Sequence, residues 1–423
     1  MYEISIINNN VSTVINALST SFNSPRITGT IKKGINVIDN FTFNILPNNP
    51  GYNLLKQYKT LVNVYNTKTG VFEFQGRVLL SKHSMSSTGE ISKSVICESE
   101  LGYLHDSHQR YGEYHNISVK DFLKLILDNH NSQVSDDKRF VLGNVTVRDN
   151  NDSLHRFLGY DDTFETIKDK LISRLGGEFQ IRYENGIRYL DYLSNIGHTS
   201  EVQIRLAKNL KTITESKDPS EIATRLIPLG IKINNSEKRL DIKSVNSGRD
   251  YLDDYLAQEE FGIIEKTVIF DDVTEASNLI RKGRENLSAN RIRKQYLISA
   301  LDLYTIGLDT ESIDLYNYYP VINPLMNINE HLRVIEKTID INNPQNTEFT
   351  IGDKFEDIKN YQISTKKEST LTKNKADESY KIAERNVAEI QATNNTVDIL
   401  NQNLDSANKQ IERQRKFIIM GVW

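Results

Sequence analysis

Three histidines and an aspartate lie close together early in the chain, and they are the side chains best suited to bind a metal ion. They are His105, Asp106, His108 and His115. Zinc enzymes place such ligands at fixed spacings, as in an HExxH helix, and the sequence has no such motif. The surrounding residues 103–116 are rich in aromatic and polar types. We therefore expect a solvated loop with surface histidines, and no metal site.

The single cysteine, Cys97, could act as a nucleophile if one of these histidines served as its base. Residues 94–99 alternate in a way that predicts a β-strand, with Cys97 and Val95 on one face and Ile96 and Glu98 on the other. A buried structural cysteine is the commoner outcome at such a position. One cysteine also excludes an intrachain disulfide.

Adjacent carboxylates are a third group with chemical potential. They occur at Asp161-Asp162, Asp253-Asp254, Glu259-Glu260 and Asp271-Asp272. The first and last pairs stand at expected helix starts, where anions complement the helix dipole. A glycosidase needs two carboxyl groups that face each other across a cleft, and adjacency does not provide that. We therefore expect no catalytic, cofactor-binding or metal-binding residues.

The elements that would position these residues are mostly strands in the first hundred residues. Alternating patterns separated by Gly, Asn and Ser turns cover residues 37–46, 61–65, 71–80 and 91–98. They predict a compact β-barrel or sandwich.

Helix signals follow. Ser118 is expected to cap a helix that ends near Asn129, and Asp162 is expected to precede a helix that Gly176-Gly177 stops. Asn185-Gly186 then lies between two strand patterns, which predicts a hairpin with a type I′ turn.

A second β region is predicted toward residue 353. Strands are expected from about residue 202 to 232 and at 296–303, 313–316, 332–341 and 347–351, with a helix over 274–291. Pro219 and Pro228 are expected to mark turns, and Pro320, Pro324 and Pro344 to lie in loops, where a missing backbone donor does least harm.

The composition is that of a polar, folded chain. Its 423 residues include 43 Asn, and Lys plus Arg total 52 against 56 Asp plus Glu. The net charge of −4 gives no strong overall attraction to nucleic acid or anionic lipid. The longest apolar stretch falls below the roughly 18 residues of a membrane span, and the first residues do not resemble a signal peptide. We expect about three domains, no membrane anchor and synthesis in a cytoplasm.

The C-terminal region differs sharply in composition, because no Gly occurs between Gly352 and Gly421. A 3.5-residue repeat predicts a coiled coil within a helix over residues 365–416, with the seam Ile390, Thr393, Val397, Leu400, Leu404, Ala407 and Ile411. The alternative is a single amphipathic helix folded back on the β domains. The β-branched residues and Leu residues of the seam favour a coiled coil of two helices.

The last residues form an apolar tail that could dock another protein. They are Phe417, Ile418, Ile419, Met420, Val422 and Trp423. Burial in the end of the coil itself is an equally good interpretation.

A series of short motifs resembles one protein family. The motifs are GYLHDS (102–107), HNISV (115–119), LDNHN (127–131), KRFVLG (138–143), TFE (163–165), LGG (175–177), YLDY (189–192), AKNL (207–210), ATRLIPLG (223–230), IDINNP (339–344) and FTIG (349–352). In this order they are similar to the tail-tip hub proteins of long-tailed phages of Gram-positive hosts, also called prophage endopeptidase tail or tail-associated lysin proteins. The resemblance covers about residues 1–353.

The resemblance implies an α+β, mainly β fold like the baseplate hub of contractile-tailed phages. The expected parts are a β-barrel-like domain (1–100), an α+β domain (101–200), a second β-barrel-like domain with a helical insertion (201–355) and the C-terminal helix (356–423). The implied assembly is a homotrimer in the virion that closes the distal end of the tail tube and opens for DNA passage.

The implied partners are the distal tail protein, the tail tube, a fibre or receptor-binding tip protein, and the tape measure protein or DNA in the lumen. Assembly would take place in the host cytoplasm. Many relatives carry a C-terminal peptidase domain, and this sequence has no cysteine- or metallo-peptidase motif, so we expect a structural protein. Two alternatives stay open: a cell-wall hydrolase acting as a murein endopeptidase, and a carbohydrate-binding adhesin favoured by 20 Tyr.

Overall fold

The computed structural model describes residues 2–17, 19, 24–149, 155–219, 222–233, 238–289, 293–353 and 407–412. Met1–Lys354 form one compact unit, and Phe355–Trp423 form a second. In the second unit the described residues, 407–412, are helical.

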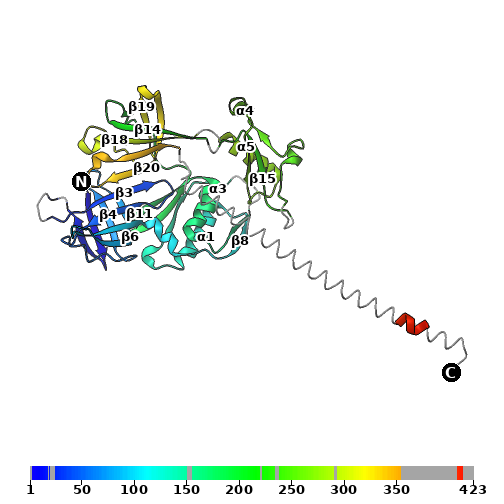
Figure 1. Ribbon diagram of the computed structural model, residues 1–423, viewed down its shortest axis with the longest axis horizontal. Coiled ribbons are helices and arrows are strands. Elements are labelled where there is room, and N and C mark those ends of the chain that lie inside the picture. The colour runs from blue at the N-terminus through cyan, green and yellow to red at the C-terminus, as the bar shows by residue number, and fades with distance from the viewer. Residues whose placement is uncertain are drawn as a thin grey trace. The chain divides into compact units, whose positions relative to one another are not determined.

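A large, mainly antiparallel sheet dominates the first unit (Figure 1). Its N-terminal strands are β1 (Tyr2–Asn8), β2 (Val11–Asn16), β3 (Thr28–Gly34), β4 (Asn40–Ile45), β5 (Leu61–Asn66), β6 (Val71–Met85) and β7 (Ile91–Ser99). Ile4 and Val64 share a core with Phe41 and Val95, although β1 and β5 lie far from β4 along the sheet. The sheet therefore curls over its own buried face, as expected for a barrel-like region.

The other strands of this sheet come from the end of the unit. They are β13 (Ile204–Arg205), β14 (Leu210–Asp218), β18 (Arg293–Ala300), β19 (Tyr318–Asn323), β20 (Ile328–Asp340) and β21 (Glu348–Gly352), with short 3₁₀ turns at Leu303–Ile306, Pro324–Met326 and Pro344–Asn346. A second core lies under them and includes Ile298, Val334 and Phe349.

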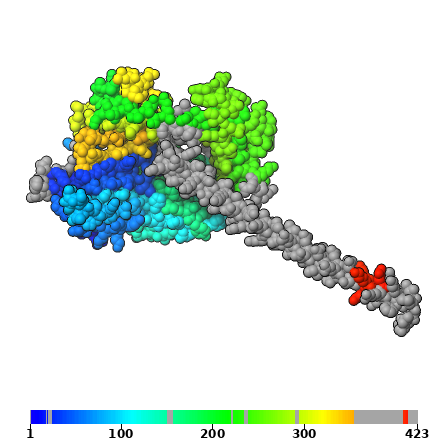
Figure 2. Space-filling model, in the orientation of Figure 1, coloured from blue at the N-terminus to red at the C-terminus, as the bar shows by residue number. Residues whose placement is uncertain are grey.

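The two β regions join edge to edge. β20 pairs with β3 through five residue pairs, with Ile339 opposite Ile31. The resulting strand order is β14-β18-β21-β20-β3-β4-β7-β6-β5-β1-β2, with β13 and β19 attached beside β20. Figure 2 shows the orange strands of the second region directly beside the blue strands of the first.

An α+β region packs a third core between residues 100 and 193. Its elements are a 3₁₀ helix (Glu100–Asp106), β8 (Gly112–His115), α1 (Val119–Asn131), a 3₁₀ turn (Asp136–Lys138), β9 (Val141–Val145), β10 (His155–Leu158), α2 (Thr163–Ile167), a π-helical turn (Lys168–Ile172), α3 (Ser173–Leu175), β11 (Glu178–Glu184) and β12 (Ile187–Leu193). Ser118 caps α1 by accepting a hydrogen bond from the Asp121 amide. Asn185 and Gly186 have the positive φ values of the predicted turn.

A smaller subdomain occupies the stretch between β14 and β18. It contains β15 (Arg225–Leu229), a 3₁₀ turn (Lys243–Val245), β16 (Leu252–Asp253), α4 (Tyr255–Phe261), β17 (Glu265–Ile269) and α5 (Ala276–Ala289). Its strands form a separate sheet in the order β16-β15-β17. Its own core includes Leu226, Leu252, Leu279 and Leu287.

Three element predictions were wrong. Residues 313–316 do not form the predicted strand. The strand in this region is β19, and it contains Pro320, which was expected to lie in a loop. Pro228 also lies within a strand, β15. Each proline has a partner strand on one side at its own position, opposite His331 and Val268 respectively. A proline has no backbone N–H, so it is tolerated in a strand at a position where no second neighbouring strand needs a hydrogen bond from that residue.

The predicted α+β, mainly β fold is confirmed. Among the described residues no helix is long and apolar enough to cross a membrane. The division into domains at residues 100, 200 and 355 stays a prediction.

Candidate functional site

The histidines suggested as metal ligands lie at different places in the α+β region. His105 Nδ1 is 2.9 Å from Asp162 Oδ1, and its ring packs on Phe164. Asp162 also caps α2 by accepting from the Glu165 amide at 3.1 Å. His115 lies in β8 opposite His155. Within the described part of the chain, no three His, Cys, Asp or Glu side chains are grouped to hold a metal ion.

The prediction of a solvated loop over residues 103–116 was wrong for its first half, although His105, His108 and His115 are exposed as expected. Tyr103 and Leu104 are buried in the 3₁₀ helix, and Ser107 and Gln109 are buried after it. The Tyr103 ring is covered by two guanidinium groups, those of Arg77 and Arg188, each 5.0 Å from its centre. Cation–π contacts of this kind are possible only after the chain folds, so local composition could not reveal them.

A buried Ser–His pair was missed in the sequence. Ser107 Oγ is 2.6 Å from His130 Nδ1 and 2.7 Å from Thr163 Oγ1. His130 Nε2 lies 3.2 Å from the Lys138 carbonyl. The signal was available, because His130 falls on the same face of α1 as Ile126 and Leu127, which are also buried.

Ser107 and His130 are the residue types of a nucleophile and its general base, but both side chains are buried and inaccessible to a substrate. Ser107 is 2% exposed and His130 is 0% exposed. A polymeric substrate cannot reach a hydroxyl in that position. Burial lowers the pKa of His130, so the neutral ring is favoured. The arrangement ties α1 and α2 to the 3₁₀ helix through satisfied buried polar groups.

Cys97 is fully buried in β7 opposite Phe41, as predicted. Burial raises the pKa of its thiol well above the ordinary value. A thiolate is the reactive form of cysteine, so this position is structural.

Three of the four carboxylate pairs have structural partners for at least one of their members. Asp162 caps α2 as expected, and Asp254 caps α4. The expectation that Asp271-Asp272 start a helix was wrong, because α5 begins at Ala276. Asp271 instead pairs with Arg239, and buried Asp272 lies 3.3 Å from Lys282 Nζ.

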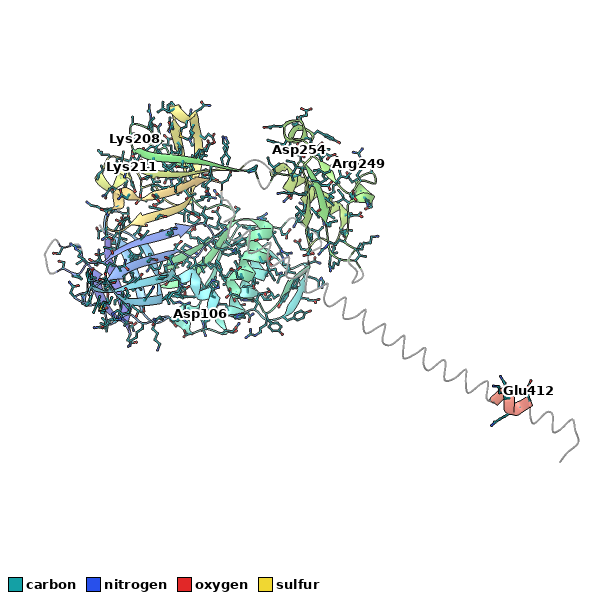
Figure 3. The ribbon with its side chains drawn as sticks, viewed as in Figure 1. Asp106, Lys208, Lys211, Arg249, Asp254 and Glu412 are labelled. Carbon is teal, nitrogen blue, oxygen red and sulfur yellow. The ribbon has the colours of Figure 1, made fainter. Side chains whose placement is uncertain are left out.

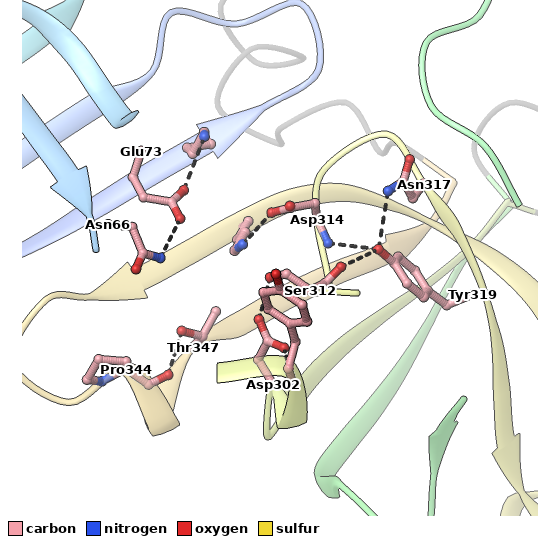
Figure 4. Close-up of polar contacts among 12 residues, drawn as sticks. Asn66, Glu73, Asp302, Ser312, Asp314, Asn317, Tyr319, Pro344 and Thr347 are labelled. Atoms are coloured by element: carbon pink, nitrogen blue, oxygen red, sulfur yellow. Dashed lines mark hydrogen bonds and ion pairs between the residues drawn. The ribbon is translucent and has the colours of Figure 1, made fainter. Parts of the chain in front are cut away.

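A buried charge cluster lies where the two β regions meet (Figure 4). Lys337 of β20 is 5% exposed, and its Nζ is 2.6 Å from Asp314 Oδ1. Glu73 of β6 is also 5% exposed, accepts from Asn66 at 3.0 Å and lies 3.5 Å from Lys33 Nζ. Burial alone would raise the pKa of Glu73, but the nearby Lys337 and Lys33 outweigh it and the pKa is lowered. The cluster therefore holds both carboxylates ionised and fixes β6 relative to β20.

A largely buried ion pair joins the α+β region to the second β region. The Arg333 guanidinium of β20 binds both carboxylate oxygens of Glu178, with Nη2 2.8 Å from Oε2. The same nitrogen donates to the Ile196 carbonyl at 2.7 Å. Bidentate guanidinium–carboxylate pairs fix orientation as well as distance. The three cores are thus held in one arrangement.

The outward side of the large sheet is a mainly polar surface, interrupted by a few apolar side chains, which we call the polar face. Because side chains alternate along a strand, it lies opposite the buried Ile31, Phe41, Ile339 and Phe349. Directly paired residues form three rows across it: Thr212, Ser299, Glu348, Thr338, Lys32 and Asn40; Thr214, Leu297, Thr350 and Glu336; Asp340, Thr30, Thr42, Ile96 and Leu80.

The polar face spans strands from both β regions and ends in unpaired edges. β14 pairs with β18 alone, and the second half of β6, after Arg77, pairs with β7 alone among the described strands. Figure 3 marks the start of the β14 edge with Lys208 and Lys211. Unpaired N–H and C=O groups on such edges are available to another chain.

The predicted oligomerisation residues lie almost entirely outside the described residues. Of the seam, Ala407 and Ile411 are in the described helical turn, and both are exposed. Ile390, Thr393, Val397, Leu400 and Leu404 lie outside it, as does the apolar tail from Phe417 to Trp423. The coiled coil and the docking tail stay predictions.

Comparison with known proteins finds one matching family and several similar structures. Residues 198–362 match the family described as prophage endopeptidase tail. No curated protein matches the sequence.

Three solved structures are similar over most of the chain. Prophage tail protein gp18 from Listeria monocytogenes EGD-e is 14% identical, with a TM-score of 0.53 over 86% of this chain and 98% of its own. The 43 kDa tail protein of prophage MuSo2 from Shewanella oneidensis is 12% identical, with a TM-score of 0.58 over 84% and 98%. A tail protein from Neisseria meningitidis MC58 is 13% identical, with a TM-score of 0.55 over 83% and 96%.

At these identities the structural similarity establishes the fold, and the family match covers the second β region. Both agree with the resemblance carried by the sequence motifs. The chain therefore has the fold of prophage tail proteins, and its residues 198–362 match the prophage endopeptidase tail family.

Proposed function

We propose that the chain is the structural hub at the distal tip of a phage or phage-like tail. Three copies form a ring that closes the tail tube, and the polar face lines its lumen. The observation that carries this proposal is the polar face itself, because its rows of mainly polar side chains cross the junction between β20 and β3 and so span both β regions. An enzyme that acts through a single pocket has no use for such a surface.

The chemistry of the polar face suits a passage for DNA. It consists largely of Thr, Ser and Asn, and its acidic Glu336, Asp340 and Glu348 outnumber Lys32 in the three rows. DNA binding without sequence preference depends on cations that neutralise phosphates. A surface with few cations lets DNA pass without being retained.

The open edges supply a means of ring closure. The β14 edge of one copy and the second half of β6 in the next copy lie at opposite ends of the polar face. Pairing between two different edges is a head-to-tail contact, and such contacts close into a ring when the rotation between copies permits. Closure would also remove the exposed edges.

The C-terminal segment extends the proposal to partners. The seam would associate once the hub holds three copies together, because linkage raises their effective concentration. The apolar tail would dock a fibre or tip protein. The distal tail protein and tail tube would contact the ring, and the tape measure protein or DNA would occupy the lumen. The particle would assemble in the host cytoplasm.

We propose no catalytic role. The burial of Ser107, His130 and Cys97 supports this proposal, since the side chains with nucleophile chemistry that we considered are inaccessible.

Electron microscopy of the purified full-length chain tests the proposal. We expect ring-shaped projections with threefold symmetry and a central opening. Compact particles without an opening, at protein concentrations of tens of micromolar or more, would contradict the hub.

A further inference from the structure

The small subdomain between β14 and β18 carries an open groove whose use the hub does not explain. Its volume is about 560 Å³. It is bordered by the turn after residue 245, by the β16–α4 connection and by α5. Its lining includes Arg249, Leu252, Asp253, Asp254, Tyr255 and Arg284. Figure 3 marks Arg249 and Asp254 on this subdomain.

The two carboxylates in the groove are already satisfied within the protein. Asp253 accepts from Arg225 at 2.7 and 3.1 Å, and from Gln258 at 2.7 Å. Asp254 accepts from the Ala257 amide at 3.1 Å as the cap of α4. Neither carboxylate therefore needs a ligand.

The two arginines differ from these carboxylates. Arg249 and Arg284 are both exposed, and neither makes an ion pair of 4 Å or less with a described residue. A guanidinium group binds carboxylate or phosphate through two parallel hydrogen bonds. The charge that the groove offers to a ligand is therefore positive.

The apolar part of the groove is also available. The Tyr255 side chain is 64% exposed and Leu256 is 81% exposed. The ring of Tyr251, in contrast, is covered by the Arg225 guanidinium at 4.0 Å. The floor is closed by Leu252 and Leu287, which belong to the subdomain core. Tyr255 is thus an exposed aromatic surface in the same groove as two arginines that make no ion pair of 4 Å or less with a described residue.

We propose that this groove binds an anionic saccharide. Arg249 and Arg284 take its carboxylate or phosphate groups, and the Tyr255 ring packs against the apolar face of a sugar ring. An extended peptide is less suited, because the neighbouring edge strand β16 has two residues and cannot support strand addition. A nucleic acid is disfavoured by Asp250, Glu259 and Glu260, which would repel a continuous row of phosphates.

Calorimetric titration of the full-length chain tests this inference. The probes are a hyaluronate hexasaccharide for the carboxylate, an oligosaccharide that carries a single phosphate group for the phosphate, a neutral dextran of similar length, and oligo(dT). We expect one or both acidic saccharides to bind and dextran and oligo(dT) not to bind. The acidic probe that binds identifies which anion the arginines recognise.

Variants locate the binding. Arg249→Gln together with Arg284→Gln should weaken binding at least about tenfold, since each charge-assisted contact contributes that order of affinity. Tyr255→Ala should weaken it with the charge unchanged. The matched control is Arg281→Gln together with Lys238→Gln, which removes the same charge outside the groove and should leave affinity unchanged.

The proposal is overturned if neither acidic saccharide binds, if oligo(dT) binds more tightly than both, or if the arginine double variant binds as well as the control. Thermal unfolding of each variant should stay close to the parent, because Arg249, Arg284, Tyr255 and Lys238 are exposed and Arg281 pairs with the exposed Glu285 in a surface i,i+4 contact. The outcome does not depend on ring formation, so failure here leaves the hub proposal intact.

Discussion

Lys337 Nζ lies 2.6 Å from Asp314 Oδ1 beneath the strands that join the two β regions. The ammonium group also faces Glu73 and Asp302, so one cation balances several carboxylates. Removing it would leave Asp314 without its ion pair and Glu73 with Lys33 as its remaining ion-pair partner. Breaking a buried pair costs about 3 to 5 kcal/mol, and a smaller loss is expected here because the Asp314 side chain is half exposed.

Lys337→Met should therefore lower the free energy of unfolding by about 2 to 4 kcal/mol. Urea unfolding followed by circular dichroism measures the change. Lys124→Met removes an exposed helix pair with Asp128 and should cost about 0.5 kcal/mol or less. Equal losses in the two variants would show that the buried cluster does not join the β regions.

Asp39 gives a prediction about pH. Burial raises its pKa from 3.8 to about 6 in the folded protein, so the folded state binds a proton more tightly than the unfolded state. Between about pH 4 and pH 6 this group destabilises the fold as pH rises, and the cost is complete above pH 6. Asp39→Asn should raise the free energy of unfolding by about 1 to 3 kcal/mol at pH 8.

The asparagine retains an oxygen that can accept from the Gly34 amide, as Asp39 does at 3.2 Å. The stabilisation should disappear at about pH 4 and below, where Asp39 is protonated in both states. Asp128→Asn, on the exposed face of α1, is the control. A gain that is the same at pH 4 and pH 8 would rule out the titration of Asp39 as its source.

Ser107 distinguishes a structural network from a hydrolase. Ser107→Ala removes the partner of His130 Nδ1 and should destabilise the fold by about 1 to 3 kcal/mol, because a buried polar atom loses its hydrogen bond. Ser132→Ala, which removes an exposed hydroxyl bound to the Asn129 carbonyl, should have little effect. Zymography on purified peptidoglycan should show no clearing by the parent chain. Clearing that disappears in Ser107→Ala would establish the hydrolase instead.

The polar face gives a prediction about DNA. Glu336→Lys together with Glu348→Lys removes two negative charges and adds two positive ones, so the net charge of each chain rises by four. Duplex DNA should then be retained, with affinity that falls steeply as salt rises. Glu165→Lys together with Asp169→Lys makes the same change at exposed positions near α2. Fluorescence anisotropy with a short duplex should show stronger binding for the first pair, and equal binding would argue against a lumen surface.

Local structure was largely predictable from the sequence. The Ser118 cap, the Asn185-Gly186 turn and the buried face of Cys97 follow from interactions within a few residues. Pro320 was predicted to lie in a loop because a proline was assumed to exclude a strand. In β19 it has a partner strand on one side only, opposite His331, so its missing N–H breaks no second set of hydrogen bonds. The strand then fell outside the predicted segment at 313–316.

Long-range features were not predictable. The pairing of Ile31 with Ile339 joins residues some three hundred positions apart, and no local pattern encodes that choice. The same holds for Lys337 with Glu73, and for the Arg249 and Arg284 groove. In each case the sequence shows ordinary charged residues, and their significance arises only when folding removes them from water or leaves them unpaired.

The mass of the intact oligomer in solution tests the central proposal most directly. Native mass spectrometry and light scattering of the full-length chain, from about 1 to 50 µM and at moderate salt, cover the range where weak edge pairing becomes populated. The hub predicts a species of three times the 48.5 kDa chain mass. A monomer or a closed dimer throughout that range would contradict it.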